Sequence, residues 1–285
     1  MKISVCLIVF GYLGKSAKLS LDSISRIQPS RICIIADSQG KKWIGDFGTE
    51  DVVKNICWHI AKSDVARLID LKLDESQGYS EYGKSRFIKL TVYKWTILRE
   101  CLSLHPETEF ALFTDLDVLW NQDPRLEIER SLKSSNSLVA IQDDTPVGAG
   151  ARHYCTGVMA WKNNSKSIEV LRELEQSQKQ LLESGIEIPD EPTFNKWMKT
   201  HNPTIAQTLN PRLVVIGHRY FHLLLNKRFR TRELICFHAN YVVGERTKYR
   251  RLQSLKWQIQ RNPRWFQIYI LELIKYLLSG KKIRL

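Results

Sequence analysis

Residues 110–120 read FALFTDLDVLW. This stretch is an apolar run rich in residues that favour β-strands, so we expect a strand that delivers Asp115 and Asp117 to its carboxyl end, followed by a turn over 121–124. Side chains two residues apart on a strand point the same way, and two carboxylates held together repel each other unless a cation lies between them. Hard divalent ions take such oxygen ligands together with phosphate oxygens. The spacing therefore indicates a metal site; the alternative is a strand that ends in an acidic turn.

Strand-like and helix-like segments alternate along the rest of the chain. We expect further strands over 3–10, 31–36, 51–58, 137–141, 158–161, 212–216 and 234–237. Apolar spacing predicts helices over 19–27, 87–102, 126–132, 165–183, 192–198 and 265–278. Such alternation favours an α/β fold with a mostly parallel sheet, helices on both faces and ligands at the carboxyl ends of the strands. Asp37, Asp115 and Asp117 are all predicted at that edge.

Composition bounds the class of protein. The 285 residues are 43% hydrophobic and 10% aromatic, which suffices for one large domain or two small ones. The six cysteines are scattered without a Cys-x-x-Cys pair, which favours reduced, buried thiols and a cytosolic compartment. The apolar start of the chain resembles a short secretion signal, but Gly11 and Gly14 interrupt it. We therefore interpret it as the first strand, with a cleaved signal as the alternative.

Positive charge is concentrated towards the C-terminus. Residues 226–285 hold 15 Lys or Arg and three Glu, whereas the whole chain has a net charge of +13. Such a block favours a polyanionic partner: a diphosphate, an anionic membrane surface or nucleic acid. The segment 265–278 is apolar and aromatic, but it is shorter than the about 20 residues that span a bilayer. We predict that this helix lies on an anionic membrane surface; its packing on the folded domain is the alternative.

Four motifs occur in one order along the chain. They are FTDLDVLW at 113–120, TGVM at 156–159, DEPTFN at 190–195, and FHANY at 237–241 with Gly244 and Lys248 after it. In this order the chain resembles nucleotide-diphospho-sugar transferases, and more narrowly the retaining glycosyltransferases of GT-A fold. That group includes plant galactosyl- and xylosyltransferases and bacterial lipooligosaccharide galactosyltransferases.

The resemblance covers roughly residues 85–250 and implies a domain organisation. It implies one GT-A-like catalytic domain over 1–250, with a nucleotide-binding half over 1–125 and an acceptor and catalytic half over 126–250. A basic, amphipathic helical segment would follow over 251–285.

The resemblance also implies roles for the residues on the donor side. Asp115 and Asp117 match the acid pair that binds Mn²⁺ or Mg²⁺ with the donor diphosphate, and Asp115 would also face the donor. His238 matches the histidine that completes the metal shell. Gly244 and Lys248 match a segment that closes over the diphosphate.

Other matched positions concern the transferred sugar. Lys94 resembles a basic position that reaches the donor phosphates or sugar. Asp190 and Glu191 match an acid pair at the anomeric carbon, where Glu191 would stabilise positive charge and Asp190 would bond sugar hydroxyls. Asp143 and Asp144 are the alternatives for the catalytic role. Cys155 departs from the family, whose members often carry Asn there, and this difference bears on which sugar is bound.

These residue types predict an enzyme. Together with the resemblance, they predict a metal-dependent glycosyltransferase that moves a sugar from a nucleotide-diphosphate donor, a UDP-sugar, to a glycan or lipid-linked acceptor. Retention is what the resemblance implies. The expected location is the cytoplasm, on the cytoplasmic face of a membrane. The competing classes are a metal-dependent nuclease and a basic nucleic-acid-binding protein, since aromatic and basic residues interleave over 226–285. A nuclease would need more clustered acids, and no nucleic-acid motif is visible, so we expect no nucleic-acid partner.

Overall fold

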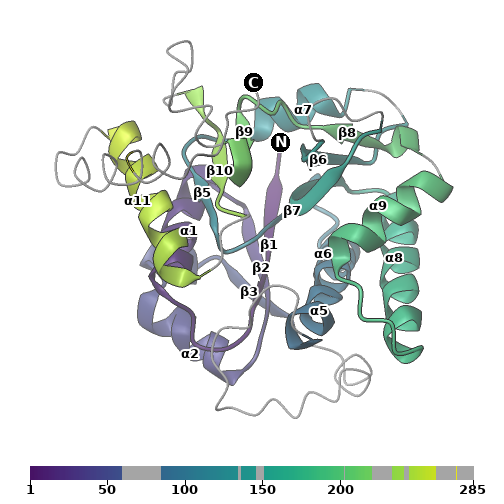
Figure 1. Ribbon diagram of the computed structural model, residues 1–285, viewed down its shortest axis with the longest axis horizontal. Coiled ribbons are helices and arrows are strands. Elements are labelled where there is room, and N and C mark those ends of the chain that lie inside the picture. Colours follow the sequence, from purple (N-terminus) through teal and green to yellow (C-terminus); the bar gives the residue numbers. More distant parts are fainter. Residues whose placement is uncertain are drawn as a thin grey trace.

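Figure 1 shows the chain as a computed structural model, with a central sheet between layers of helices. The structure describes residues 1–59, 85–133, 136–145, 151–201, 203–219, 233–240, 244–260 and 274. The predicted helix over 265–278 lies outside these residues except for Ile274, as does most of the basic block. Among the residues that are described, no helix combines the length and apolar character that crossing a membrane requires.

The central sheet has seven strands in the order β3-β2-β1-β4-β7-β6-β8. Their bounds are β1 Ile3–Val9, β2 Arg31–Ala36, β3 Ile56–His59, β4 Phe110–Thr114, β6 Val139–Asp143, β7 Tyr154–Lys162 and β8 Ala206–Thr208. Neighbouring strands pair in parallel except at β7, which runs antiparallel to both β4 and β6. The predicted mostly parallel α/β sheet is therefore confirmed.

Helices cover both faces of this sheet (Figure 1). One face carries α1 (Lys15–Ser23), η1 (Ile24–Ile27), α2 (Ser38–Phe47), α3 (Glu50–Val53) and α7 (Arg125–Ser131). The other carries α5 (Ser85–Thr91), α6 (Tyr93–Leu104), α8 (Ser165–Glu183), α9 (Asp190–Thr200) and η2 (Pro203–Ile205). Strand β1 serves both layers, because Val5 and Leu7 pack towards the first set and Cys6 towards the second. Burial of both faces explains why the strand is a continuous apolar run.

A second, small sheet lies beside the first, in the order β5-β10-β9. Its strands are β5 (Val118–Trp120), β9 (Val214–Ile216) and β10 (Cys236–His238), with η3 (Gly217–Arg219) after β9 and α11 (Glu245–Gln260) packed above. Leu252 and Leu255 of α11 join Val215 and Phe237 in a separate buried cluster. Helix α11 thus crosses the boundary that we predicted between residues 250 and 251, and its first part belongs to the folded core.

Several predicted elements need correction. The run over 110–120 is not one strand: β4 ends at Thr114, and the chain turns through Asp115 and Asp117 before β5 begins. The turn carries the chain from one sheet to the other, because Asp115 N–H donates to the carbonyl of Gly157 on β7 (2.9 Å), whereas the carbonyl of Asp117 accepts from Ala239 N–H (2.8 Å). The strand predicted over 51–58 was wrong in its first half, since Glu50–Val53 is helical and β3 follows. Helix α2 and strand β8 were not predicted.

Other predictions are confirmed. The helix over 165–183 has the predicted bounds; Asn164 caps it by accepting from Ser167 N–H, and its apolar side faces α6. All six cysteines are free, and five of them are buried. Asp37 lies at the predicted edge, where its carboxylate accepts from the N–H groups of Gly11 (2.9 and 3.0 Å) and Gly40 (2.6 Å). It therefore shapes the loops after β1 and β2.

Candidate active site

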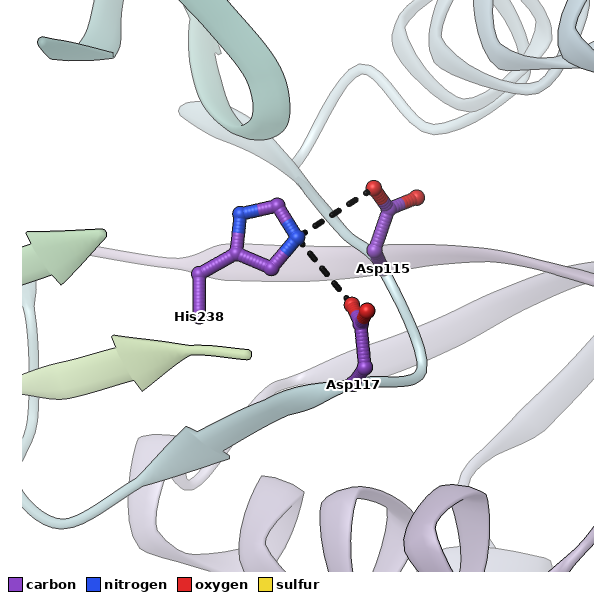
Figure 2. Close-up of side chains that lie close together, drawn as sticks. All are labelled: Asp115, Asp117 and His238. Carbon is purple, nitrogen blue, oxygen red and sulfur yellow. Dashed lines mark ion pairs between the residues drawn. The ribbon is translucent and has the colours of Figure 1, made fainter. Parts of the chain in front are cut away.

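Three predicted metal ligands meet where the two sheets adjoin. Asp115 and Asp117 project from the turn after β4, and His238 projects from the end of β10 (Figure 2). The His238 Nε2 atom lies 3.0 Å from Asp117 Oδ1 and 3.7 Å from Asp115 Oδ2. The turn, rather than a continuous strand, brings both carboxylates to the same side of the imidazole.

A hydrogen bond at the other nitrogen of the His238 ring fixes the orientation of the ring. Its Nδ1 atom lies 2.8 Å from Gln142 Oε1, which can only accept a hydrogen bond, so Nδ1 carries the proton in this contact. Nε2 is then the nitrogen that faces the two carboxylates, where it can hold a proton or bind a metal ion through its lone pair. Gly157 allows this placement, because a Cβ atom there would lie 2.1 Å from His238 Cε1 and 2.8 Å from Asp115 Oδ2.

A lone pair that faces two carboxylates requires a proton or a cation between them. The three ligand atoms lie within 4.8 Å of one another. Neighbouring ligands of an octahedral ion with bonds of about 2.1 Å are about 3 Å apart, close to the distance between His238 and Asp117. The donor set of two carboxylates and one imidazole therefore fits Mn²⁺ or Mg²⁺.

Lys248 balances the charge of Asp117. Its Nζ atom lies 2.6 Å from Asp117 Oδ2. Burial by itself would raise the pKa of Asp117, but Lys248 and His238 hold that pKa well below its usual range. The approach of Lys248 depends on the start of α11, where Gly244 adopts a φ of 91°, a conformation that favours glycine, and its carbonyl accepts from Lys248 N–H.

The start of α11 is also anchored to α1. The Glu245 carboxylate accepts from Ser16 N–H (2.7 Å) and from the Ser16 hydroxyl. Gly14 makes room for this contact, because a Cβ atom there would lie 2.3 Å from Glu245 Cδ. A helix far along the sequence is thereby held beside the turn that carries Asp115 and Asp117.

Lys94 connects the acid pair of the turn with the acid pair of α9. Its buried Nζ atom lies 3.1 Å from Asp115 Oδ1 and 2.8 Å from Asp190 Oδ2. Burial would lower the pKa of Lys94, but Asp115 and then Asp190 raise it above its usual value. Asp115 itself has a raised pKa, because burial outweighs Lys94 and His238.

Asp190 and Glu191 occupy the first turn of α9. Asp190 is buried; its carboxylate accepts from the Thr156 hydroxyl, and its N–H donates to Thr91 Oγ1 (3.2 Å). Burial, followed by the charges of Asp144 and Asp190, raises the pKa of Glu191 to about 7. Acids at this end of a helix also stabilise it, so a structural role and a chemical role are compatible.

A family comparison can now be set beside this geometry. The model of the family described as nucleotide-diphospho-sugar transferase matches residues 49–252, more than half of the chain. The chain belongs to the nucleotide-diphospho-sugar transferase family. This transferase is an enzyme, a glycosyltransferase that uses nucleotide-sugar donors. All the candidate site residues lie inside the matched range. No curated protein matches the chain.

Solved structures confirm the GT-A-like fold. The galactosyltransferase LgtC, in complex with donor and acceptor sugar analogues, aligns with a TM-score of 0.55 and 12% identity over 94% of this chain and 100% of that chain. The apo form of mouse xyloside xylosyltransferase 1 gives 0.51 and 12% identity, covering 86% and 100% of the two chains. A glycosyltransferase involved in glycosylation of the major capsid of PBCV-1 gives 0.51 and 13%, covering 90% and 99%. At these identities the likeness concerns the fold.

The transferase brings the predicted site residues together, while their roles stay predictions. Lys94 differs from expectation in its immediate partners, which are two carboxylates. Gln142, Thr156 and Gly157 were not predicted to shape the site. Gly157 and Thr156 stand inside a motif that the sequence analysis singled out, so their position was a usable signal. No such sequence signal marks Gln142, because its contact with His238 forms only where the seven-stranded sheet and the small sheet adjoin.

Proposed function

We propose that the transferase catalyses metal-dependent transfer of a sugar from a UDP-sugar to a glycan or lipid-linked acceptor, with retention. The observation that carries this proposal is the position of His238. Gln142 fixes its ring, and its Nε2 atom faces Asp115 and Asp117. This arrangement calls for a cation on the side where Lys248 also lies.

On the donor side, Asp115, Asp117 and His238 would hold Mn²⁺ or Mg²⁺. A bound divalent ion stabilises the negative charge that a leaving diphosphate gains. Lys248 would move from Asp117 to the diphosphate once the metal shares the charge of that carboxylate. The glycine conformation at Gly244 and the anchor between Glu245 and Ser16 would keep Lys248 within reach.

On the sugar side, positive charge develops at the anomeric carbon as the bond to the diphosphate breaks. Glu191 would stabilise that charge as a carboxylate, and Asp190, held by Lys94 and Thr156, would bond sugar hydroxyls. With retention, the leaving diphosphate itself can take the proton of the acceptor hydroxyl. Cys155 lies 3.6 Å from His238 Nδ1, and we propose that this thiol replaces a sugar-binding amide and alters the choice of sugar.

The first experiment tests the donor. A screen of nucleotide-sugars for Mn²⁺-dependent hydrolysis should find one that the enzyme cleaves slowly, because transferases pass their sugar to water when acceptor is absent. Calorimetry should show that UDP binds only with Mn²⁺. Equal binding with and without the metal, or hydrolysis of single-stranded nucleic acid instead, would contradict the proposal.

The acceptor and the location form a separate part of the proposal. We propose that the segment 265–278 and its flanking basic residues dock on the cytoplasmic face of an anionic membrane and present a lipid-linked acceptor; the free thiols support a reducing compartment. Co-sedimentation with anionic vesicles should retain the full chain but not a chain that ends at Asn262. Equal failure of both at low salt would contradict docking, and aggregation of the shorter chain would show that the segment packs in the core.

A further inference from the structure

We propose that the transferase holds its acceptor by a phosphate ester, in a cavity beside the proposed catalytic carboxylate. The cavity has a volume of about 460 Å³ and is lined by the start of β7, one face of α9, and the segment from η2 to β8 (Figure 1). This volume lies within the roughly 300–1,000 Å³ of small-molecule sites. The inference rests on the proposed function in one respect, because it assigns the cavity to the acceptor of that reaction.

Two cations lie at the mouth of the cavity. Arg152 and Lys199 both line it, and both residues are exposed. Neither side chain forms an ion pair or a hydrogen bond with the part of the chain that the structure describes. Their charges are therefore available to an anionic ligand. The planar guanidinium of arginine binds phosphate through two parallel hydrogen bonds, and a second cation nearby suits the charge of a phosphate.

The hydroxyl of Tyr154 is a third group that a ligand can use. Tyr154 is 5% exposed and lines the cavity, and its ring packs edge-on against Phe194. Within the described residues, its hydroxyl has no hydrogen-bond partner. It can therefore donate to a phosphate oxygen in the cavity. Two cations and a buried phenol hydroxyl thus surround one position for an anion.

The floor of the cavity is apolar. Met198 and Ala206 line it and are buried. The amides of Asn195 and Gln207 line it too, but both already donate to backbone carbonyls. A neutral sugar needs a hydrogen-bond partner for each hydroxyl that it buries, and this floor offers few. A phosphate that carries an apolar chain fits better, as in the ester that joins a lipid to a sugar.

The cavity lies one helical turn from the proposed catalytic carboxylate. Glu191 and Asn195 are four residues apart on α9, so they share a face and lie about 6 Å apart along the helix axis. The Asn195 amide ties the two places together by donating to the carbonyls of Glu191 (2.9 Å) and Tyr154 (2.8 Å). A phosphate in the cavity leaves the sugar attached to it next to Glu191. The acceptor class that follows is a short, lipid-linked glycosyl phosphate.

Binding of a simple alkyl phosphate tests the cavity without donor, metal or acceptor. The full chain is titrated by calorimetry with hexyl phosphate, with hexanol and with inorganic phosphate. Hexyl phosphate should bind, and hexanol should show no measurable binding because it lacks the anion. Inorganic phosphate should bind about 10-fold more weakly, because it lacks the apolar chain. UDP with Mn²⁺ should not displace hexyl phosphate, because no described residue that we assign to the donor lines the cavity.

Three variants test where the phosphate binds. Arg152→Gln/Lys199→Gln should weaken hexyl phosphate binding by about 10-fold or more, because it removes two charge-assisted contacts. Tyr154→Phe removes only the hydroxyl and should weaken binding by roughly 5-fold. Lys196→Gln is the matched control, because this exposed lysine lies on α9 outside the lining of the cavity, and it should bind like the wild type.

Several results would overturn the proposal: no binding of hexyl phosphate, equal affinity in the wild type and the double variant, equal binding of hexanol, or displacement by UDP. Inorganic phosphate that binds as tightly as hexyl phosphate would overturn the assignment to a lipid-linked ester. Circular dichroism checks the fold of each variant, and if the double variant does not fold, unchanged affinity in Tyr154→Phe overturns the proposal instead. Because the titration needs no donor, absence of nucleotide-sugar hydrolysis would refute the proposed function and leave this result unaffected.

Discussion

Asp117 is a buried carboxylate and Glu191 a half-buried one of the same site, and they have opposite tendencies to hold a proton. Burial raises the pKa of both groups, but Lys248 and His238 overcome this at Asp117 and hold its pKa well below the usual range. Near Glu191 the charges of Asp144 and Asp190 add to the effect of burial, and its pKa rises to about 7. The difference teaches that the turn with Asp117 stays negatively charged, which suits a cation, whereas the first turn of α9 carries a carboxylate that titrates near neutral pH.

The strongest test of this comparison removes the permanent charge. Asp117→Asn should lower kcat/KM for Mn²⁺-dependent donor hydrolysis by on the order of 10³-fold, because it deletes one hard ligand charge and the ion pair with Lys248. Asp115→Asn should behave similarly. Steady-state kinetics with circular dichroism as the fold control provide the measurement. Near-normal turnover in either variant would mean that the turn is not the metal site.

The second test removes the titrating charge. Glu191→Gln should lower kcat by on the order of 10²-fold with little change in donor affinity, because a carboxylate at the anomeric carbon acts mainly in the transition state. In the wild type, kcat should rise as pH increases through about 7, because Glu191 becomes ionised. The variant should lose this rise. Unchanged turnover would move the catalytic role to Asp190, Asp143 or Asp144.

A third test separates metal binding from diphosphate binding. His238→Ala should weaken Mn²⁺ and UDP together, by more than the about 10–100-fold that loss of an outer-shell partner costs. Lys248→Ala should weaken UDP and affect Mn²⁺ alone much less. Separate calorimetric titrations of Mn²⁺ and UDP measure both. Negligible effects in both variants would show that the segment from His238 to Lys248 has a structural role.

A smaller effect should follow from the backbone that supports the proposed metal ligands. Gly157→Ala should weaken Mn²⁺ binding by roughly 10-fold, similar to loss of a supporting contact, because its Cβ would displace the His238 ring. Manganese titration monitored by electron spin resonance measures free and bound metal. Binding equal to the wild type would show that the ring has another acceptable position.

Gly45→Ala is the matched control with the smallest effect. Apart from the two neighbouring residues and the nearby backbone of α2 itself, no atom lies within 4 Å of a Cβ built at Gly45, which is inside α2. The substitution should leave Mn²⁺ binding unchanged and raise the free energy of unfolding by about 0.5–1 kcal/mol, because alanine favours a helix interior. Urea denaturation measures this gain, and a loss of stability would contradict the described packing of α2.

Local sequence patterns determined much of the fold. The helix over 165–183 was predictable because its cap at Asn164 and its apolar spacing are both encoded by near neighbours. The strands over 3–9 and 31–36 were predictable because burial on both faces leaves a continuous apolar run. The sequence also indicated the acid pair after β4, but it did not indicate that these residues form a turn. A strand and a turn compete over 115–117, and only pairing with β7 and β10 decides between them.

By itself, the sequence determined which chemical groups are available and the order in which they occur: an acid pair after an apolar strand, a second acid pair before a helix, and a histidine followed by a glycine and a lysine. The tertiary structure decided which of these groups lie close enough to shift one another's pKa. Lys248 reaches Asp117 across 131 residues because α11 is anchored on α1. Glu191 meets Asp144 and His153 because α9 packs against β7. Propensities act between near neighbours in the chain, whereas pKa shifts and metal ligation depend on distance and burial in space, which folding alone establishes.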